Sequence, residues 1–485
     1  MTRFLAHPWR SVRWFLVAAG LPAIWACNTP PLAPPTPAPE RTVKQVFQAA
    51  VNRDIDILFM VDDSPSMQPL ITKLAANFPV FMNVLSSLPG GLPNVHIAVV
   101  SQDLGAGPVA PTSQCRVGGD QGMFQTAPRV AGCMTGLSPS DHFLSSIGGQ
   151  QNFTGNIADV FSCIANLGDQ GCGFEHQFAS VLRALEPGPL QPATNVSTTN
   201  PFLRPSAYLS IIMLTNEDDC SAPPDSKLFD TSSQLVSDPL GPLASFRCNE
   251  FGHLCNGKKP PRTPAVLDNC TSAEDGVLLK VSDVIARTAA LKNNDPSKIL
   301  VAAITGPPTP YEVVLLPGTT ATGVTEQQPN IKHSCTEADG TYADPAVRIK
   351  MWVDAFKGTF VSICDKTFEP ALTQIATAIG KAIGPQCVQG KLVDSDVATP
   401  GVQPDCIVTD ISTNPQGGQT EALIPSCAKS GNMPPCWKAS MTDASCNGST
   451  LLAVSRVGGM QPSGVNTDVQ CAVCIPNDTN PGCMY

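Results

Sequence analysis

The residues best suited to hold a metal ion follow an apolar run near the start of the chain. Asp62, Ser64 and Ser66 form the pattern Asp-x-Ser-x-Ser directly after the apolar segment 57–61. A buried strand would carry the Asp62 carboxylate to the carboxyl edge of a sheet, where both serine hydroxyls can turn toward the same point. Hard oxygen ligands of this kind suit Mg²⁺ or another hard divalent ion better than zinc.

The same residue types also occur in turns and helix caps, where their side chains bind free backbone N–H groups. The context favours metal binding over this simpler interpretation. A strand-like run precedes the motif, and apolar residues with helical spacing follow it between Leu70 and Leu88. Pro79 is expected to bend or break that helix, because proline lacks a backbone N–H.

These features resemble the start of a von Willebrand factor A (VWA) domain, whose metal-ion-dependent adhesion site begins with Asp-x-Ser-x-Ser after the first strand. Strand-like segments at 94–101, 207–215 and 298–305 continue the resemblance over residues 46–385, with long interruptions. The resemblance implies an α/β fold with a doubly wound, mostly parallel sheet and flanking helices. It also implies Mg²⁺, Mn²⁺ or Ca²⁺ at the site, with an open position for an acidic residue of a partner protein.

The segment 207–215, which resembles the family's central strand, is followed by a departure from the family pattern. The family places Asp after the strand's last Thr, whereas Asn216 follows Thr215 here. An amide oxygen can ligate a metal ion but brings no charge. Of the three acidic residues that come next, Asp218 is the one we expect to restore negative potential. A solvated acidic loop is the equally favoured alternative.

The loop expected to carry the family's Thr ligand shows the second departure. This loop, 171–176, precedes a predicted helix at 177–185 and contains no Thr. Glu175 could reach the metal or a bound water instead, although the positive end of a helix also favours a nearby Glu for structural reasons. Without both family ligands, the site is expected to bind metal weakly or not at all.

The N-terminal residues read as an export signal. Arginines precede a short apolar stretch within residues 1–26, and this stretch is too short to span a membrane comfortably. The sequence 24–27 resembles a bacterial lipobox, which implies lipidation of Cys27. A secretory signal cut near Ala26 is the alternative. In a lipid-anchored protein, the Pro-rich segment 27–45 would act as a stiff tether between the membrane and the folded part. We therefore expect a protein anchored in the cell envelope, at the outer membrane or cell surface, or secreted if the lipobox is not used.

Cysteine usage agrees with export. If Cys27 carries a lipid, eighteen of the nineteen cysteines remain and can pair as nine disulfides, which indicates an oxidising compartment. A zinc or redox site at Cys471 and Cys474 is disfavoured, since no complete four-ligand pattern is present. Cysteines crowd the interruptions on either side of the expected ligand loops. We expect these loops to form a cap or rim around Asp62, although simple stabilisation of surface insertions would explain them equally well.

Residues 386–485 differ from the preceding chain and are expected to form a small, disulfide-held module of β or irregular structure. The net charge of −10 disfavours a nucleic-acid partner. The six histidines form no paired zinc motif, and no nucleophile motif or phosphate loop is present. His176 beside Glu175 comes nearest to catalytic chemistry, but a structural role is favoured.

These patterns predict an exported, lipid-anchored binding or adhesion protein that uses its metal site to bind a protein partner, and not an enzyme. Two alternatives stay open. The first is a metal-independent interaction scaffold in the cell envelope, and the second is an envelope hydrolase with a dispersed site.

Overall fold

The structure is a computed structural model that describes residues 42–47, 53–88, 92–107, 115–129, 132–138, 140–197, 200–320, 322–383, 386–388, 390–413, 419–441, 446, 450–456, 465–475 and 479–484. The predicted signal peptide at 1–26, the predicted lipidation site Cys27 and the tether up to residue 41 lie outside these residues. Within the described part of the chain, no helix is long and apolar enough to cross a membrane.

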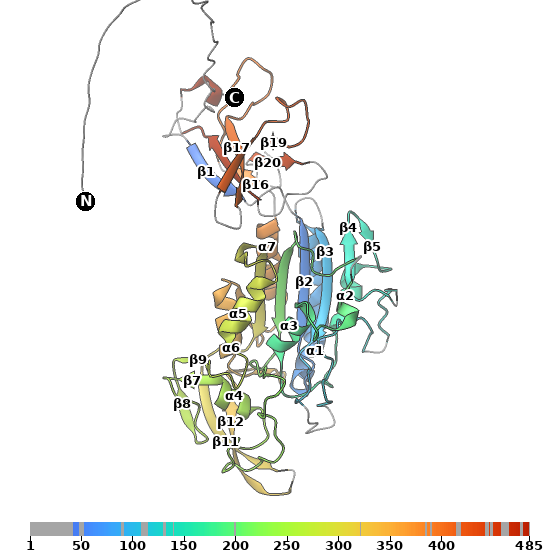
Figure 1. Cartoon of the computed structure of the whole chain (residues 1–485), viewed down its shortest axis with the longest axis vertical. Coiled ribbons are helices and arrows are strands. Elements are labelled where there is room, and N and C mark those ends of the chain that lie inside the picture. The colour runs from blue at the N-terminus through green and yellow to red at the C-terminus, as the bar shows by residue number, and fades with distance from the viewer. Residues whose placement is uncertain are drawn as a thin grey trace, which may run out of the picture.

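A seven-stranded sheet forms the centre of the molecule, in the order β15-β10-β6-β2-β3-β4-β5 (Figure 1). The five strands from β15 to β3 are parallel. They are β2 (Asp54–Val61), β3 (Asn94–Ser101), β6 (Tyr208–Leu214), β10 (Ile299–Thr305) and β15 (Thr359–Ser362). An antiparallel hairpin, β4 (Leu144–Ile147) and β5 (Gln150–Gln151), closes one edge. Every residue of β6 is buried, as expected for a strand covered on both faces.

Helices cover both faces of this sheet. One face packs against α1 (Gln68–Ser86), α2 (Ile157–Ala165) and α7 (Glu369–Ile383), around the buried rings of Phe59, Phe78 and Phe161. The other face packs against α3 (Gln177–Leu185), α5 (Val281–Ala290) and α6 (Val347–Ala355). The predicted α/β class with a mostly parallel sheet is therefore confirmed. The predicted break at Pro79 is wrong, because α1 continues through this residue.

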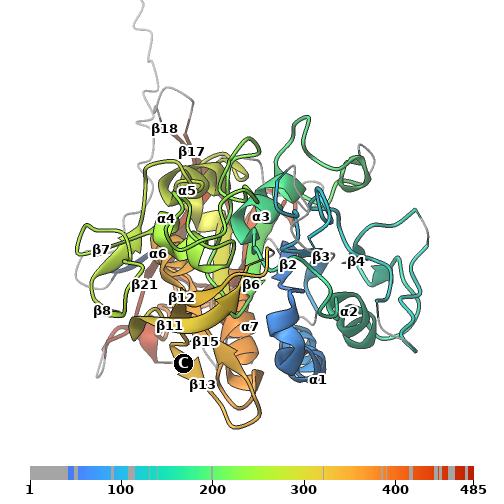
Figure 2. The same cartoon turned by 90° about the horizontal axis from the view of Figure 1, so that it is seen from below.

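Long insertions gather at the carboxyl edge of the parallel strands, far from the C-terminal module (Figures 1 and 2). A three-stranded sheet, β12-β11-β8, is the largest unit there. The inserted elements are α4 (Phe246–Gly252), β7 (His253–Cys255), β8 (Ala265–Leu267), β9 (Cys270–Ser272), β11 (Tyr311–Thr319), β12 (Thr325–Lys332), β13 (Cys335–Thr336) and β14 (Tyr342–Ala343).

The C-terminal module is built from short antiparallel strands. A four-stranded sheet has the order β1-β21-β17-β18, and a three-stranded sheet has the order β16-β20-β19. Its strands are β16 (Gln386–Val388), β17 (Cys406–Thr413), β18 (Gln419–Ile424), β19 (Cys436–Ser440), β20 (Thr450–Ser455) and β21 (Val465–Ala472). The remaining strand, β1 (Thr42–Phe47), comes from the start of the described chain and pairs with β21. β1 therefore lies across the expected boundary between tether and core domain at residue 45.

All eighteen cysteines after Cys27 pair into nine disulfides, as predicted: Cys115–Cys172, Cys133–Cys163, Cys220–Cys248, Cys255–Cys270, Cys335–Cys364, Cys387–Cys446, Cys406–Cys471, Cys427–Cys436 and Cys474–Cys483. Cys471 and Cys474 belong to two different disulfides, so neither has a free thiolate for zinc. Disulfides in this number belong to an oxidising compartment.

Candidate metal site

The carboxyl ends of two neighbouring strands bring Asp62 and Thr215 together. β2 pairs with β6, and each of these residues follows the last residue of its strand. The backbone N–H of Asp62 donates to the carbonyl of Leu214 at 2.9 Å. The Thr215 hydroxyl donates to Oδ2 of Asp62 at 2.6 Å, which fixes the orientation of this buried carboxylate.

The two serines of the motif lie beside Asp62 at the start of α1. The backbone N–H of Ser64 donates to Oδ1 of Asp62 at 2.8 Å. Ser66 lies in the short 3₁₀ turn Pro65–Met67, and its Oγ is 2.7 Å from Oγ of Ser64. The hydroxyl of Ser66 also donates to Oδ1 of Asn216 at 2.9 Å. Four residues proposed from the sequence, Asp62, Ser64, Ser66 and Asn216, therefore form one connected network.

Glu175 reaches the same region from the loop before α3. Gly171 packs closely against the residue after Asp62, because a Cβ at this glycine would lie 2.3 Å from Oδ1 of Asp63. The disulfide Cys115–Cys172 holds the loop further. Glu175 is buried, and its Oε1 has no hydrogen-bond partner among the described residues. Burial, followed by the charges of Glu217 and Asp62, raises the pKa of Glu175 well above its ordinary value.

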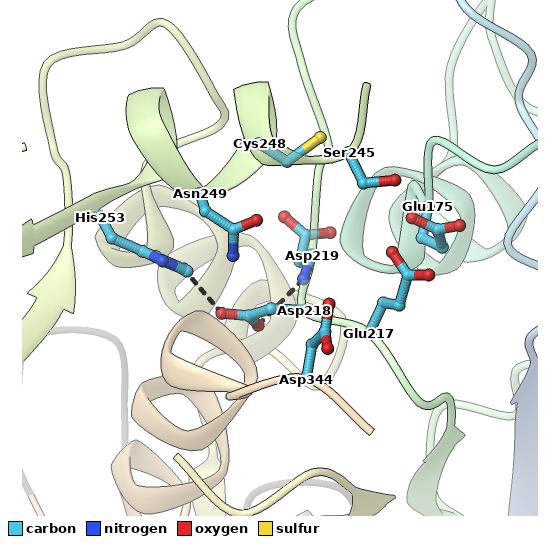
Figure 3. A pocket seen from close by; sticks show the side chains of 9 residues that line it. All are labelled: Glu175, Glu217, Asp218, Asp219, Ser245, Cys248, Asn249, His253 and Asp344. Carbon is cyan, nitrogen blue, oxygen red and sulfur yellow. Dashed lines mark hydrogen bonds and ion pairs between the residues drawn. The ribbon is translucent and has the colours of Figure 1, made fainter. Parts of the chain in front are cut away.

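Glu217 is the acidic residue that turns toward this group. Figure 3 shows the side chains of Glu175 and Glu217 pointing toward each other. Burial, together with the charges of Asp344 and Asp62, raises the pKa of Glu217 to about 8. Among the described residues, no lysine, arginine or histidine forms an ion pair with Asp62, Glu175 or Glu217.

Asp218, the acidic residue favoured by the sequence, points the other way. Its carboxylate accepts hydrogen bonds from the first backbone N–H groups of α6, at 2.7 Å from Val347, 2.8 Å from Arg348 and 3.1 Å from Ile349. His253 contacts the same carboxylate at 2.8 Å (Figure 3). Burial opposes ionisation, but these hydrogen bonds and the nearby charges hold the pKa of Asp218 below its ordinary value. Asp218 is thus engaged in capping α6, and Glu217 replaces it as the candidate ligand.

The insertion after Asn216 folds over the acidic group. A small cavity beside the site is lined by Glu175, Glu217 and Asp344 on one side and by Ser245 and Asn249 of the α4 region on the other (Figure 3). The disulfide Cys220–Cys248 ties α4 to the end of the acidic loop. Disulfide-held inserted residues therefore line the cavity beside Glu175 and Glu217.

The oxygen atoms in this region are of the type that a hard divalent cation prefers. They belong to the carboxyl groups of Asp62 and of the nearby Glu175 and Glu217, and to the hydroxyls of Ser64 and Ser66. The unpartnered Oε1 of Glu175 is an atom that a bound cation would satisfy. Within the described residues, no group of three or more His, Cys, Asp or Glu side chains is arranged to hold a metal ion. A cation site here would therefore depend on the serine hydroxyls and on water molecules as well as on the carboxyl groups.

Comparisons with known proteins add little to this picture. No protein-family model matches the chain. A search of curated proteins also finds no match. Among solved structures, the chain is similar to the pilus adhesin SpaC of Lactobacillus rhamnosus GG in its open conformation, with 12% identity and a TM-score of 0.30 over 89% of this chain and 40% of that one. It is also similar to the pilus adhesin RrgA of Streptococcus pneumoniae, with 9% identity and a TM-score of 0.27 over 89% of this chain and 57% of that one. Similarity this low supports no conclusion about fold or function.

Two members of the site were missed in the sequence. Thr215 was noted only as the end of a strand, and Glu217 was passed over for Asp218. Residues 216 and 217 form a bend, so strand alternation gives no signal that selects Glu217 over Asp218. His176, the nearest candidate for catalysis, lies outside the network, since its Nε2 contacts the carbonyl oxygen of Gly105 at 2.8 Å.

Proposed function

We propose that the chain is an exported binding protein whose VWA-like α/β domain uses a divalent cation to bind an acidic group of a protein partner. The observation that carries this proposal is the hydrogen-bonded network of Asp62, Ser64, Ser66 and Asn216 at the carboxyl edge of a parallel sheet, near the buried carboxyl groups of Glu175 and Glu217. Ligands in open α/β sheets bind at this edge. The position of Asp-x-Ser-x-Ser after β2, a strand in the middle of the sheet beside β6, also supports the VWA-like assignment.

Each residue has a distinct role in this proposal. Asp62 would contact the cation directly, and the 2.6 Å hydrogen bond from Thr215 keeps its carboxylate in place. Ser64 and Ser66 would turn their oxygen lone pairs toward the ion. Glu175 and Glu217, whose pKa values are raised, would supply charge once they lose their protons. When bound, Mg²⁺ or Mn²⁺ would neutralise this charge and offer a coordination position to a carboxylate of the partner.

Placement at the cell surface is the second part of the proposal. The nine disulfides support an oxidising compartment. A lipid on Cys27 would anchor the protein in the envelope, so that adhesion or assembly at the surface becomes its role. Mass spectrometry of the N-terminal peptide from membranes tests the anchor, with Cys27→Ser as the control. An unmodified peptide in the wild-type membrane fraction would refute it.

Calorimetric titration of the oxidised protein with Mg²⁺ and Mn²⁺ tests the cation site. We expect saturable binding in the wild type and its loss in Asp62→Ala. Asp410→Asn is the matched control, because Asp410 is a partly buried acid paired with Arg456 in the C-terminal module. Binding retained in Asp62→Ala would place the ion elsewhere. No binding to any variant, with or without an acidic peptide, would leave a metal-independent scaffold as the function.

A further inference from the structure

A second cavity of about 500 Å³ lies beside α3 and is separate from the small acidic cavity. It is lined by α3, the segment 186–191 that follows it, the loop residues 222–224 and part of α5. Its volume lies within the range of about 300–1,000 Å³ that is typical of small-molecule sites in proteins. Nothing in the proposed cation site requires a hollow of this size.

The walls of this cavity are mainly apolar. Leu182 from α3, Leu190 from the following segment and Phe229 from the insertion contribute large side chains. Pro187 and Pro223 line it as well, and proline fixes the backbone torsion φ, so these wall segments are stiff before any ligand arrives. Leu190 is 58% exposed, although it belongs to the lining. An apolar body entering the cavity would remove this surface from water.

His176 is a buried member of the lining. Its Nε2 lies 2.8 Å from the carbonyl oxygen of Gly105, and this contact fixes the orientation of the ring. His176 therefore contributes a fixed part of the cavity wall.

A cationic group stands at the same cavity. Arg287 is paired with Glu186, so their charges cancel. Arg183 donates through Nε to the carbonyl of Leu190 at 3.1 Å, and no carboxylate among the described residues forms an ion pair with it. Its charge is therefore available to an anionic group of a ligand.

We propose that this cavity binds a small molecule with an apolar body and an acidic group for Arg183. The cavity supplies one feature for each part of the ligand, namely apolar walls and a guanidinium that forms no ion pair among the described residues. Such a ligand would bind whether or not the Asp62 site holds a cation.

The probe 1-anilinonaphthalene-8-sulfonate carries both parts, since it is aromatic and bears a sulfonate. Fluorescence titration of the oxidised full-length protein is expected to show saturable one-to-one binding. Ala179→Trp would fill the cavity from α3, where Ala179 is only half-buried, and should weaken binding more than tenfold. Arg183→Gln should weaken it about tenfold, whereas Arg183→Lys keeps the charge and should restore most of the affinity.

Three controls make the result decisive. Each variant must retain the wild-type far-ultraviolet circular dichroism and thermal midpoint, and Asp62→Ala should bind the probe like the wild type. A protein that binds no cation could then still bind the probe, and a protein that does not bind the probe could still bind a cation. The two proposals are therefore tested independently. Probe binding that is not saturable, or that is unchanged in both Ala179→Trp and Arg183→Gln, would overturn the proposal.

Discussion

Glu175 and Glu217 turn their side chains toward each other at the carboxyl edge of the central sheet (Figure 3). Burial raises the pKa of both groups, to about 8 for Glu217. The folded pair therefore holds a proton near neutral pH that the unfolded chain, with ordinary pKa values of 4.5, has already released. Loss of that proton leaves two negative charges in contact, in addition to Asp62. This relationship links the acid–base behaviour of the site to its affinity for a cation.

The stability of the metal-free protein should depend on pH through Glu217. Its pKa is about 8 in the folded state, against an ordinary value of 4.5. Because the folded pKa is the higher one, this stabilisation is complete below about pH 4.5 and is lost as the pH rises through about 8. We expect the thermal midpoint in chelator to fall over this window, and to fall less in Glu217→Gln. Equal pH dependence in both proteins would contradict the assignment.

Affinity for Mg²⁺ should change in the opposite direction. Binding displaces the proton held by this pair of acids, so affinity should rise from about pH 6 to about pH 8. Calorimetry in two buffers with different ionisation enthalpies measures the proton released. Release that is unchanged in Glu217→Gln would mean that the proton comes from another group.

Substitutions at the adjacent residues Glu217 and Asp218 should affect Mg²⁺ affinity and stability differently. Glu217→Gln should weaken Mg²⁺ binding at least ~10-fold, because it removes a carboxylate. It should also stabilise the metal-free fold at neutral pH, because a neutral amide avoids the cost of keeping a buried acid protonated. Asp218→Asn should leave the affinity unchanged and destabilise the protein by about 2 kcal/mol, because it weakens the hydrogen bonds to the start of α6. Calorimetry and thermal unfolding of both variants test this. A loss of Mg²⁺ affinity in Asp218→Asn would return that residue to the ligand set.

Thr215→Val removes the hydroxyl that orients Asp62. We expect affinity for Mg²⁺ to fall about 10-fold, as for other groups that hold a metal ligand in place. Thr305→Val is the matched control, since Thr305 ends the adjacent strand β10 and its hydroxyl has no hydrogen-bond partner among the described residues. This control should bind Mg²⁺ like the wild type. Equal losses in both variants would indicate a general effect of the substitution and no role for the Thr215 hydroxyl.

A buried charge cluster at the opposite end of β2 should matter for stability alone. Arg204 donates through Nε to Asp56 at 2.7 Å and also binds the carbonyls of Ile55 and Asn94. Arg204→Met leaves the Asp56 carboxylate buried with fewer partners and should cost about 3 kcal/mol. Lys332→Met, which breaks an exposed pair with Glu312, should cost less than about 1 kcal/mol. Thermal unfolding compares the two, and a smaller loss in Arg204→Met than in Lys332→Met would contradict this ranking.

The parts of the fold that the sequence predicted are those with a local signal. The buried strands β3, β6 and β10 appear as continuous apolar runs, and α3 begins and ends where its spacing indicated. The edge hairpin of β4 and β5 was missed, because it is short and its sequence is largely polar. Pro79 gave a false break, because the packing of α1 against α2 and α7 outweighs one missing hydrogen bond.

The same distinction holds at the candidate site. The Asp-x-Ser-x-Ser motif is local, so Asp62, Ser64 and Ser66 were found together. The choice between Glu217 and Asp218 depends on the start of α6, about 130 residues further along the chain. Asp218 is oriented by hydrogen bonds from the backbone N–H groups at the start of α6. Because that helix is distant in the sequence, no short sequence window contains this information.

The pairing of β1 with β21 has a consequence for how the protein is made. β1 (Thr42–Phe47) is the first described strand to be synthesised, and β21 (Val465–Ala472) is the last. The central α/β unit lies entirely between them, so it can complete its own core while β1 still lacks its neighbour. The sheet of the C-terminal module can close only after nearly the whole chain has been synthesised. A contact between such distant segments forms slowly, so β1 spends the longest time of any described strand with its edges unpaired.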